Sequence, residues 1–168
     1  MGRGDAAGRA RTRVAPVISN ASPLIALDRI GRIELLAGAF GEVVVPGAVI
    51  RELGSIGLAT WLREQNPMHP IDRQLPESAL GAGEREAIAL ALEIDARRVL
   101  LDDGPARRLA IRLGLPVMGT GGVLVVAKQR GILPVVRPVL DELLATGFRL
   151  RWDVRARVLA DAGEGEPD

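Results

Sequence analysis

The chain has 168 residues, which suits one domain with a hydrophobic core and leaves too little for two domains of ordinary size. Apolar residues make up 48% of the sequence but aromatic residues only 2%, so Ala, Val, Leu and Ile must build that core. A formal net charge of +1 argues against a globally basic nucleic-acid binder. The absence of cysteine excludes disulfides and cysteine-based zinc sites, and a single histidine gives no support to a Ser–His triad. Any chemistry must therefore depend on carboxylates.

Short apolar runs alternate with segments of helical periodicity along the chain. The runs predict strands over residues 17–19, 42–45, 98–101 and 116–118. Helices are predicted over 23–36, 46–53, 83–95, 105–113, 122–130 and 138–146, with a short helix near 59–64 and a last one in "DVRARVLADAG". Because each run leads through a turn into a helix, the pattern predicts crossover units and an α/β sandwich with a parallel sheet.

Prolines and glycines mark several of the predicted helix ends. Four prolines stand where a first helical residue is expected, a position at which the missing N–H costs nothing. They are Pro23, Pro46, Pro105 and Pro138. Gly114 and Gly131 stand where helices are expected to end in a left-handed residue.

Both ends of the chain lack periodicity. Residues 1–13 predict a disordered basic tail and 163–168 a second disordered tail, which leaves one domain over 14–162. The first segment has no apolar core of a signal peptide. The longest apolar stretch, around 117–127, is interrupted by glycine and too short to span a bilayer. We therefore expect a soluble, cytoplasmic protein with no membrane partner.

Acidic and amide side chains follow the predicted strands. Asn20 comes after the first strand, Glu52 lies in the helix after the second, and Asp102 and Asp103 come directly after the third. Glu84 opens the helix over 83–95, whose first turn should lie at the same edge of the sheet. Ligands gather beyond the carboxyl ends of parallel strands. Clustered carboxylates raise one another's pKa, and a hard divalent cation such as Mg²⁺ relieves that repulsion.

Each of these residues also has a structural interpretation. Asp102 or Asp103 before Gly-Pro is a good N-cap, and Glu84 in a first turn complements the helix dipole. Glu52 can pair on the surface with a neighbouring arginine. Only the convergence of four chain segments on one edge favours a functional interpretation.

Two weaker signals lie near the same edge. The Gly-rich turn around Thr120 does not fit a dinucleotide or P-loop pattern, but it directs the Thr120 hydroxyl toward the edge. Arg107 and Arg108, in "DDGPARRLAIR", can meet a phosphate backbone or can simply form a solvated helix face.

Five segments of the chain together carry a family resemblance: "VISNASPLIALDRIGRIELL", "VVVPGAVIREL", "GEREAIALALE", "VLLDDGPARRLAIRLGLPVMGTGGVLVVAKQRGIL" and "PVLDELLATGFRL". They resemble the PIN-domain-like family catalogued as DUF3368, over about residues 16–160. The resemblance implies a PIN-like three-layer α/β/α sandwich with a central, mainly parallel sheet. Through the family's relation to VapC-type toxins, it also implies a Mg²⁺- or Mn²⁺-dependent endoribonuclease, often a homodimer and paired with an antitoxin protein.

The resemblance assigns the acidic positions motif by motif. The four PIN acids fall on Asn20, Glu52, Glu84 and Asp103, with Asp102 beside the last and Ser22 on the small hydroxyl residue that follows the first. The distance in sequence from Asp103 to Gly114 fits the helix after the fourth acid, which ranks Asp103 above Asp102. Asn20 departs from the pattern, because an amide oxygen can bind a cation but brings no negative charge. Metal affinity should therefore fall.

The leading hypothesis is a metal-dependent ribonuclease of the toxin–antitoxin kind that hydrolyses single-stranded RNA. Asp103, Glu84 and Glu52 are then catalytic and hold the ion together with Asn20 and Asp102. Ser22, Thr120, Arg107 and Arg108 are then expected to contact the substrate. One alternative is a catalytically weak or silent PIN-like module that binds RNA or a protein partner. Another is a nucleotide-binding regulator that uses the turn at Thr120.

Overall fold

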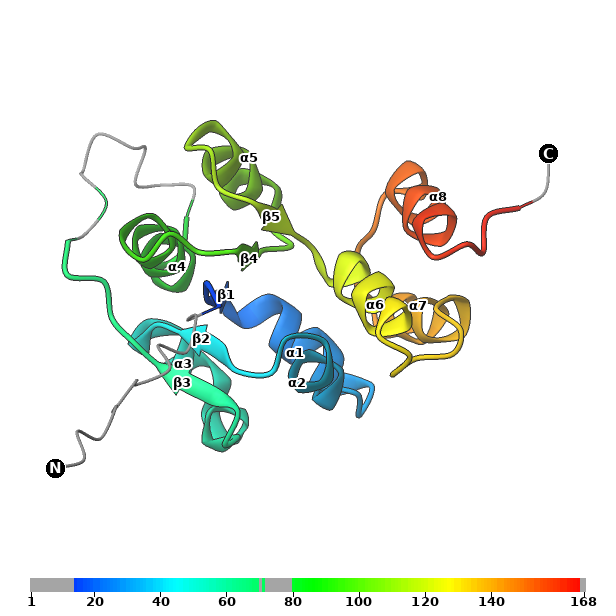
Figure 1. Ribbon diagram of the computed structural model, residues 1–168, viewed down its shortest axis with the longest axis horizontal. Coiled ribbons are helices and arrows are strands. Elements are labelled where there is room, and N and C mark those ends of the chain that lie inside the picture. Colours follow the sequence, from blue (N-terminus) through cyan, green and yellow to red (C-terminus); the bar gives the residue numbers. More distant parts are fainter. Residues whose placement is uncertain (1–13, 70, 72–79, 167–168) are drawn as a thin grey trace, which may run out of the picture.

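The computed structural model describes residues 14–69, 71 and 80–166, which form a five-stranded sheet covered by helices (Figure 1). The strands are β1 (Val17–Ser19), β2 (Val43–Val45), β3 (Leu62–Glu64), β4 (Arg98–Leu100) and β5 (Val117–Met118). The helices are α1 (Ala21–Arg29), α2 (Glu34–Phe40), α3 (Gly47–Leu53), α4 (Ala82–Glu93), α5 (Gly104–Arg112), α6 (Thr120–Gln129), α7 (Arg137–Ala145) and α8 (Trp152–Asp161), with the short 3₁₀ helix η1 (Gly54–Leu58) after α3.

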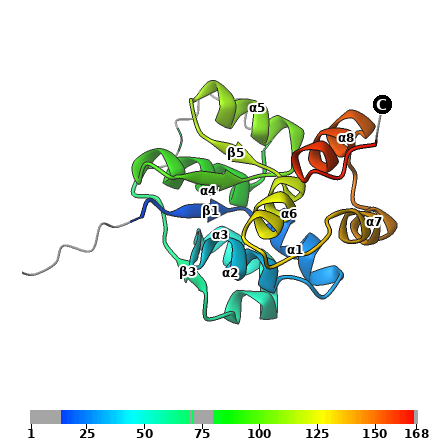
Figure 2. The same cartoon turned by 45° about the vertical axis from the view of Figure 1, so that its right-hand side comes forward.

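The strands run in the order β3-β2-β1-β4-β5, and all four pairings are parallel. Successive residues of a strand point to opposite faces, and both faces of the central strands are buried. In β1, Val17 packs with α1, α2, α6 and α7, whereas Ile18 packs with α4 and α5. Figure 2 shows α4 and α5 on one side of β1 and α1 to α3 on the other. The predicted three-layer α/β/α sandwich with a parallel sheet is confirmed.

The segment near 59–64 was predicted as a helix, and this prediction is wrong. Residues Leu62–Glu64 form the edge strand β3 instead. The backbone N–H of Val43 donates to the Trp61 carbonyl at 3.0 Å, and that of Gln65 donates to the Val45 carbonyl at 3.0 Å. Pairing with the exposed edge of β2 satisfies this segment's backbone, and such a long-range contact outweighs a weak local helical pattern.

The single helix predicted over 23–36 is also wrong, because the chain forms α1 and α2 with a break between them. Gly31 lies in that break with φ at +67°, a left-handed conformation that ends a helix and that glycine adopts without strain. The predicted stops at Gly114 and Gly131 are confirmed, with φ of +78° and +73° directly after the last turns of α5 and α6.

The four prolines all lie at or near helix starts, although not at the first helical residue. Pro46 is the N-cap of α3, Pro105 and Pro138 are the second residues of α5 and α7, and Pro23 is the third residue of α1. All of these positions precede the first N–H that needs an intrahelical partner, so the physical reason for the prediction holds over the whole first turn.

Glu164 ties the end of the chain to the domain. One of its carboxylate oxygens accepts from Lys128 Nζ and from the Val136 N–H, each at 2.7 Å, and the other accepts from the Arg137 N–H at 2.9 Å. The expected tail over 163–168 therefore includes a side chain bound to α6 and to the start of α7. The other expected tail, 1–13, lies outside the described residues. In the described part of the chain, no helix is both long and apolar enough to cross a bilayer.

Glu164 should make stability depend on pH. Burial alone would raise the pKa of this carboxyl, but Lys128 and the two N–H donors lower it from 4.5 to about 2. A depressed pKa contributes stability above pH 4.5 that is lost as the pH falls toward 2. We expect Glu164→Gln to lower the unfolding free energy at pH 7 by about 1–3 kcal/mol, the scale of a charge-assisted hydrogen bond. Urea titrations at pH 7 and at acidic pH measure this difference.

The difference between wild type and Glu164→Gln should shrink at acidic pH, because the wild-type carboxylate is then protonated. Glu142→Gln is the matched control, since it removes an exposed ion pair with Arg32, which contributes little. A loss of stability that is the same at both pH values would contradict the assignment.

Candidate active site

The order of the strands creates a crevice between β1 and β4. From β1 the chain continues outward to β2 on one side, and from β4 it continues to β5 on the other. This is the topological switch point of an open parallel sheet, where ligands bind beyond the carboxyl ends of the strands. Asn20 directly follows β1, and Asp102 and Asp103 follow β4 after one further residue. The predicted residues at this edge therefore flank the crevice.

Asn20 is the buried polar residue at the end of β1, with only 2% of its surface exposed. Its backbone N–H donates to the Leu100 carbonyl at 3.2 Å, which fixes it beside β4. Its side-chain oxygen Oδ1 is buried and has no hydrogen-bond partner. A buried polar atom without a partner is costly and uncommon, so Oδ1 is suited to an electropositive partner such as a cation.

Asp103 is the N-cap of α5. Its Oδ2 accepts from the Ala106 N–H at 3.0 Å, which satisfies one of the free donors of the first turn. The N-cap interpretation of this residue is thus confirmed. Since the cap uses only Oδ2, it does not compete with a ligand for the other oxygen.

Asp102 is held by Thr120 at the start of α6. The Thr120 N–H donates to Oδ1 at 2.8 Å, and the Thr120 hydroxyl donates to Oδ2 at 2.6 Å. Burial raises the pKa of Asp102, while both Thr120 hydrogen bonds and the charge of Arg107 act in the opposite direction. The Thr120 hydroxyl does face the predicted edge, but its proton is donated to Asp102.

Glu84 lies in the first turn of α4 and accepts a hydrogen bond from the Gly81 N–H, which satisfies a free donor before the helix. Burial raises the pKa of Glu84, this hydrogen bond lowers it, and the charges of Asp103 and Glu52 raise it further. Glu84 therefore lies within electrostatic range of one carboxylate from α3 and one from the β4–α5 connection. The positions of Glu52, Glu84 and Asp103 in the sequence predict all three at this edge of the sheet.

Glu52 reaches this group because α3 packs tightly against α4. A Cβ on Gly83 would lie 2.7 Å from Glu52 Oε1 and 3.2 Å from Val49 Cγ2, so a larger residue there would displace the Glu52 carboxylate. The start of α3 is held by Asn66, which accepts from the Gly47 N–H at 2.8 Å, and by Glu86, which accepts from the Ala48 N–H at 3.1 Å. Nothing local in the sequence indicates these two contacts, because their partners lie 19 and 38 residues away.

The residues predicted to bind the substrate differ in whether their side chains already form hydrogen bonds within the protein. Arg107 Nη1 donates to the Leu101 carbonyl at 2.8 Å, so this guanidinium supports the end of β4. A Cβ on Gly119 would lie 3.1 Å from both Arg107 Nη1 and Asp102 Oδ1, which shows how closely the turn approaches them. Ser22 and Arg108 are exposed.

A family model described as a PIN domain, DUF3368, matches residues 16–164. The chain belongs to the PIN-domain family. No curated protein matches the sequence. PIN domains are generally nucleases that use divalent metal ions, so the chain is a nuclease-like module. We call the edge at the carboxyl ends of the strands the acidic edge; its residues are Asn20, Glu52, Glu84, Asp102 and Asp103.

The PIN domain's acidic edge has the oxygen ligands that Mg²⁺ or Mn²⁺ prefers, but they are not grouped around one point. Among residues 14–69, 71 and 80–166, no three acidic or histidine side chains are grouped so that they could hold a single ion. The buried, unpartnered Asn20 Oδ1 and the like charges of Asp103 and Glu52 around Glu84 nevertheless fit a hard cation, which prefers oxygen ligands and keeps several waters.

The hydroxyl of Thr120 should be necessary to keep Asp102 in place. Thr120→Val removes one donor to a buried carboxylate, and we expect it to lower the unfolding free energy by about 1–3 kcal/mol. Thr120→Ser keeps the donor and should restore most of the stability. Because the lost hydrogen bond lowers the pKa of Asp102, the cost should grow as the pH rises.

Urea unfolding at acidic and neutral pH measures these effects of the Thr120 substitutions. Thr146→Val is the matched control, since that hydroxyl donates to the Leu143 carbonyl at the exposed end of α7. Equal stability of Thr120→Val and wild type would show that the hydroxyl does not hold Asp102.

Proposed function

We propose that this PIN domain is a metal-dependent endoribonuclease, related to VapC-type toxins, that hydrolyses phosphodiester bonds of single-stranded RNA. The observation that carries the proposal is that two like charges, Asp103 and Glu52, raise the pKa of the half-buried Glu84 at this edge of the sheet. Within the part of the chain that the structure describes, no lysine or arginine is among the groups that shift the pKa of Glu84. A divalent cation would offset the repulsion between these like charges.

The residues that would hold the ion are Glu84, Asp103, Glu52 and Asn20. Mg²⁺ or Mn²⁺ held by these residues would supply an activated water and positive charge to stabilise the phosphodiester during hydrolysis. Asp102 supports this site: Thr120 fixes both of its oxygens, and with its charge it contributes to the field at the end of β4. Arg108 and Ser22 are exposed near this edge and available to RNA phosphates.

The relation to VapC-type toxins also supports a cognate antitoxin protein, a homodimer and a cytoplasmic site of action as parts of this proposal. An antitoxin would have to block access of RNA to the acidic edge. Sedimentation analysis of the purified chain, alone and with the product of a neighbouring reading frame, tests both the dimer and the partner.

Cleavage of RNA should depend on the charge of Asp103. Asp103→Asn keeps a good N-cap for α5 but removes a negative charge from the site, so the fold should be retained. We expect wild type to cleave single-stranded RNA with Mg²⁺ or Mn²⁺, and Asp103→Asn to be slower by at least about a hundredfold, the scale of one catalytic group. Gel analysis of end-labelled RNA gives the rates.

Asp28→Asn, at an exposed position of α1, is the matched control for the loss of one acidic charge and should leave cleavage unchanged. Glu84→Gln should behave like Asp103→Asn. The proposal is lost if wild type and Asp103→Asn are equally inert with both ions and with several single-stranded RNAs.

A second candidate function is a catalytically weak or silent module that binds RNA or a protein partner. Asn20 favours it, because this side chain supplies no charge where the family pattern places the first acid. The lack of a grouped set of three acids in the described residues points the same way.

Metal binding separates the two functions. A ligand that binds only the folded state raises the midpoint of thermal unfolding, so millimolar Mn²⁺ should raise it for a nuclease and leave it unmoved for a silent module. Asn20→Asp should lower the midpoint without metal, since it adds a fourth repelling carboxylate, and should enlarge the rise with Mn²⁺. Differential scanning fluorimetry measures both.

Gln129→Glu is the matched control for Asn20→Asp, because it adds a carboxylate at an exposed position of α6 and should not change the response to Mn²⁺. If neither wild type nor Asn20→Asp responds to Mn²⁺, the acidic edge does not hold the ion.

A further inference from the structure

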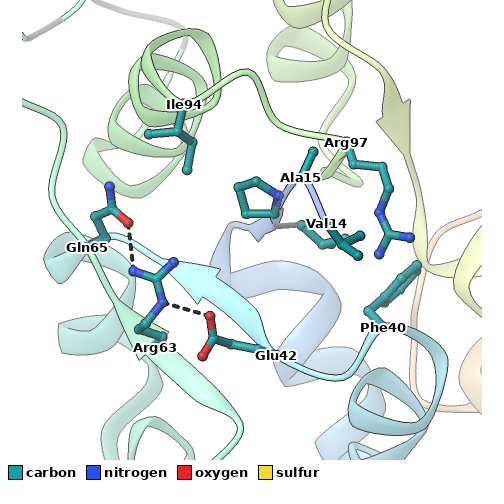
Figure 3. A pocket seen from close by; sticks show the side chains of 10 residues that line it. Val14, Ala15, Phe40, Glu42, Arg63, Gln65, Ile94 and Arg97 are labelled. Carbon is teal, nitrogen blue, oxygen red and sulfur yellow. Dashed lines mark hydrogen bonds and ion pairs between the residues drawn. The ribbon is translucent and has the colours of Figure 1, made fainter. Parts of the chain in front are cut away.

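One cavity of this PIN domain lies away from the acidic edge, where β1, β2 and β4 begin (Figure 3). It has a volume of about 540 Å³, within the range of pockets that bind small molecules. Its lining includes Val14 to Val17 before and in β1, Glu42 before β2, and Arg97 before β4. The nuclease proposal gives this cavity no role.

One part of the cavity wall is apolar and another is polar. Val14, Phe40 and Ile94 supply apolar surface from three different segments. On the side of the cavity opposite Arg97 and Phe40 in Figure 3, Arg63 donates to Glu42 at 2.7 Å through Nε and to Gln65 at 2.7 Å through Nη1. The lining's single carboxylate, Glu42, is therefore already paired with a cation.

Arg97 is the second cation of the lining, and within the described residues it forms no ion pair. Its Nε is buried without a hydrogen-bond partner, and its side chain extends toward Phe40 (Figure 3). The Arg97 backbone is fixed, because its N–H donates to the Pro16 carbonyl at 2.8 Å. A guanidinium that is partly buried and unpaired is costly, and an oxyanion is the partner that matches its donors.

Two further arginines near Arg97 add to the positive charge beside the cavity. Arg97 and Phe40 also line an adjoining cavity of about 220 Å³, together with Arg98 and Arg130. In the described part of the chain, neither Arg98 nor Arg130 pairs with a carboxylate. Three unpaired arginines thus gather around one cavity wall, in a chain whose net charge is only +1.

We infer that the cavity bounded by Arg97, Phe40, Ile94 and Arg63 binds a small organic anion, in which a phosphate or carboxylate is attached to a ring. Arg97 binds the oxyanion. The ring packs against Phe40, Ile94 and Val14, and the Arg63–Gln65 pair lies where polar atoms on the edge of the ring can reach it. Oxyanion and ring are both needed, because the lining offers the charge of Arg97 and, next to it, the apolar surface of Phe40 and Val14.

Titration of the full chain with adenosine 5′-monophosphate and with benzoate, each followed by ¹H–¹⁵N NMR, tests the inference and distinguishes the two kinds of oxyanion. At least one probe should shift amide signals from residues 14–17, 63–65 and 94–97. Inorganic phosphate, which has no ring, should bind more weakly. Equal binding of inorganic phosphate, or shifts confined to residues 20–22, 82–86 and 101–104 at the acidic edge, or no shift at millimolar concentrations of any probe, would overturn the inference.

Arg97→Gln and Glu42→Gln should change the affinity for the anion in opposite directions. Arg97→Gln removes the cation and should weaken binding at least about tenfold, as expected for loss of a charge-assisted hydrogen bond. Arg157→Gln, on the exposed face of α8, removes the same charge elsewhere and should have no effect. Glu42→Gln removes the lining's negative charge and releases Arg63, so it should tighten binding.

Glu42 and Arg63 form an exposed ion pair, whose loss costs little stability, so Glu42→Gln will fold even if Arg97→Gln does not. Unchanged or weaker binding by Glu42→Gln, or unchanged binding by Arg97→Gln, would show that the arginines do not hold the anion.

Discussion

The position of β1 between β2 and β4 is the constraint on which the other features depend. Because all four pairings are parallel, every strand ends at the same edge, and every following helix begins there. The chain leaves β1 and β4 in opposite directions, which makes the carboxyl ends of these two strands the switch point of the sheet. Asn20 and the Asp102–Asp103 pair are placed at this crevice by topology rather than by local sequence.

Parallel pairing also explains why the same carboxylates have structural roles. Helix starts expose N–H groups, and these need acceptors. Asp103 caps α5, Glu84 accepts from the residue before α4, and Asp102 accepts from the start of α6. Each acid is therefore drawn to the edge by a backbone donor, and the cost of bringing like charges together is reduced by these hydrogen bonds. The capping and the cation-binding interpretations do not exclude each other.

The sequence predicted the features that depend on short-range patterns. Alternating apolar runs were sufficient for β1, β2, β4 and β5 and for the three layers, and the acids after the strands indicated the edge of the sheet at which we propose the site. The edge strand β3 and the break between α1 and α2 were not predicted. The first depends on pairing with β2, and the second on one left-handed glycine, whose conformation a helical pattern does not reveal.

Within the candidate site, the hydrogen bonds between residues far apart in the sequence could not be predicted. Thr120 was expected at the acidic edge, but its commitment to both oxygens of Asp102 is a contact across 18 residues. The same holds for Glu86 and Asn66, which fix the start of α3 and thereby carry Glu52 toward Glu84. No spacing rule specifies which acceptor a given N–H selects, because several polar side chains of similar reach lie near every helix start.

Asn20 is consistent with the electrostatics of this crowded edge. A carboxylate at this buried position would carry a charge that solvent cannot stabilise, beside the end of β4 that leads into Asp102 and Asp103. The amide avoids that cost and still provides an oxygen, Oδ1, that has no hydrogen-bond partner. Under the proposed function, the amide would favour stability without metal over affinity for it, and the charges of Glu84 and Asp103 would matter more for holding an ion than they would beside an acid.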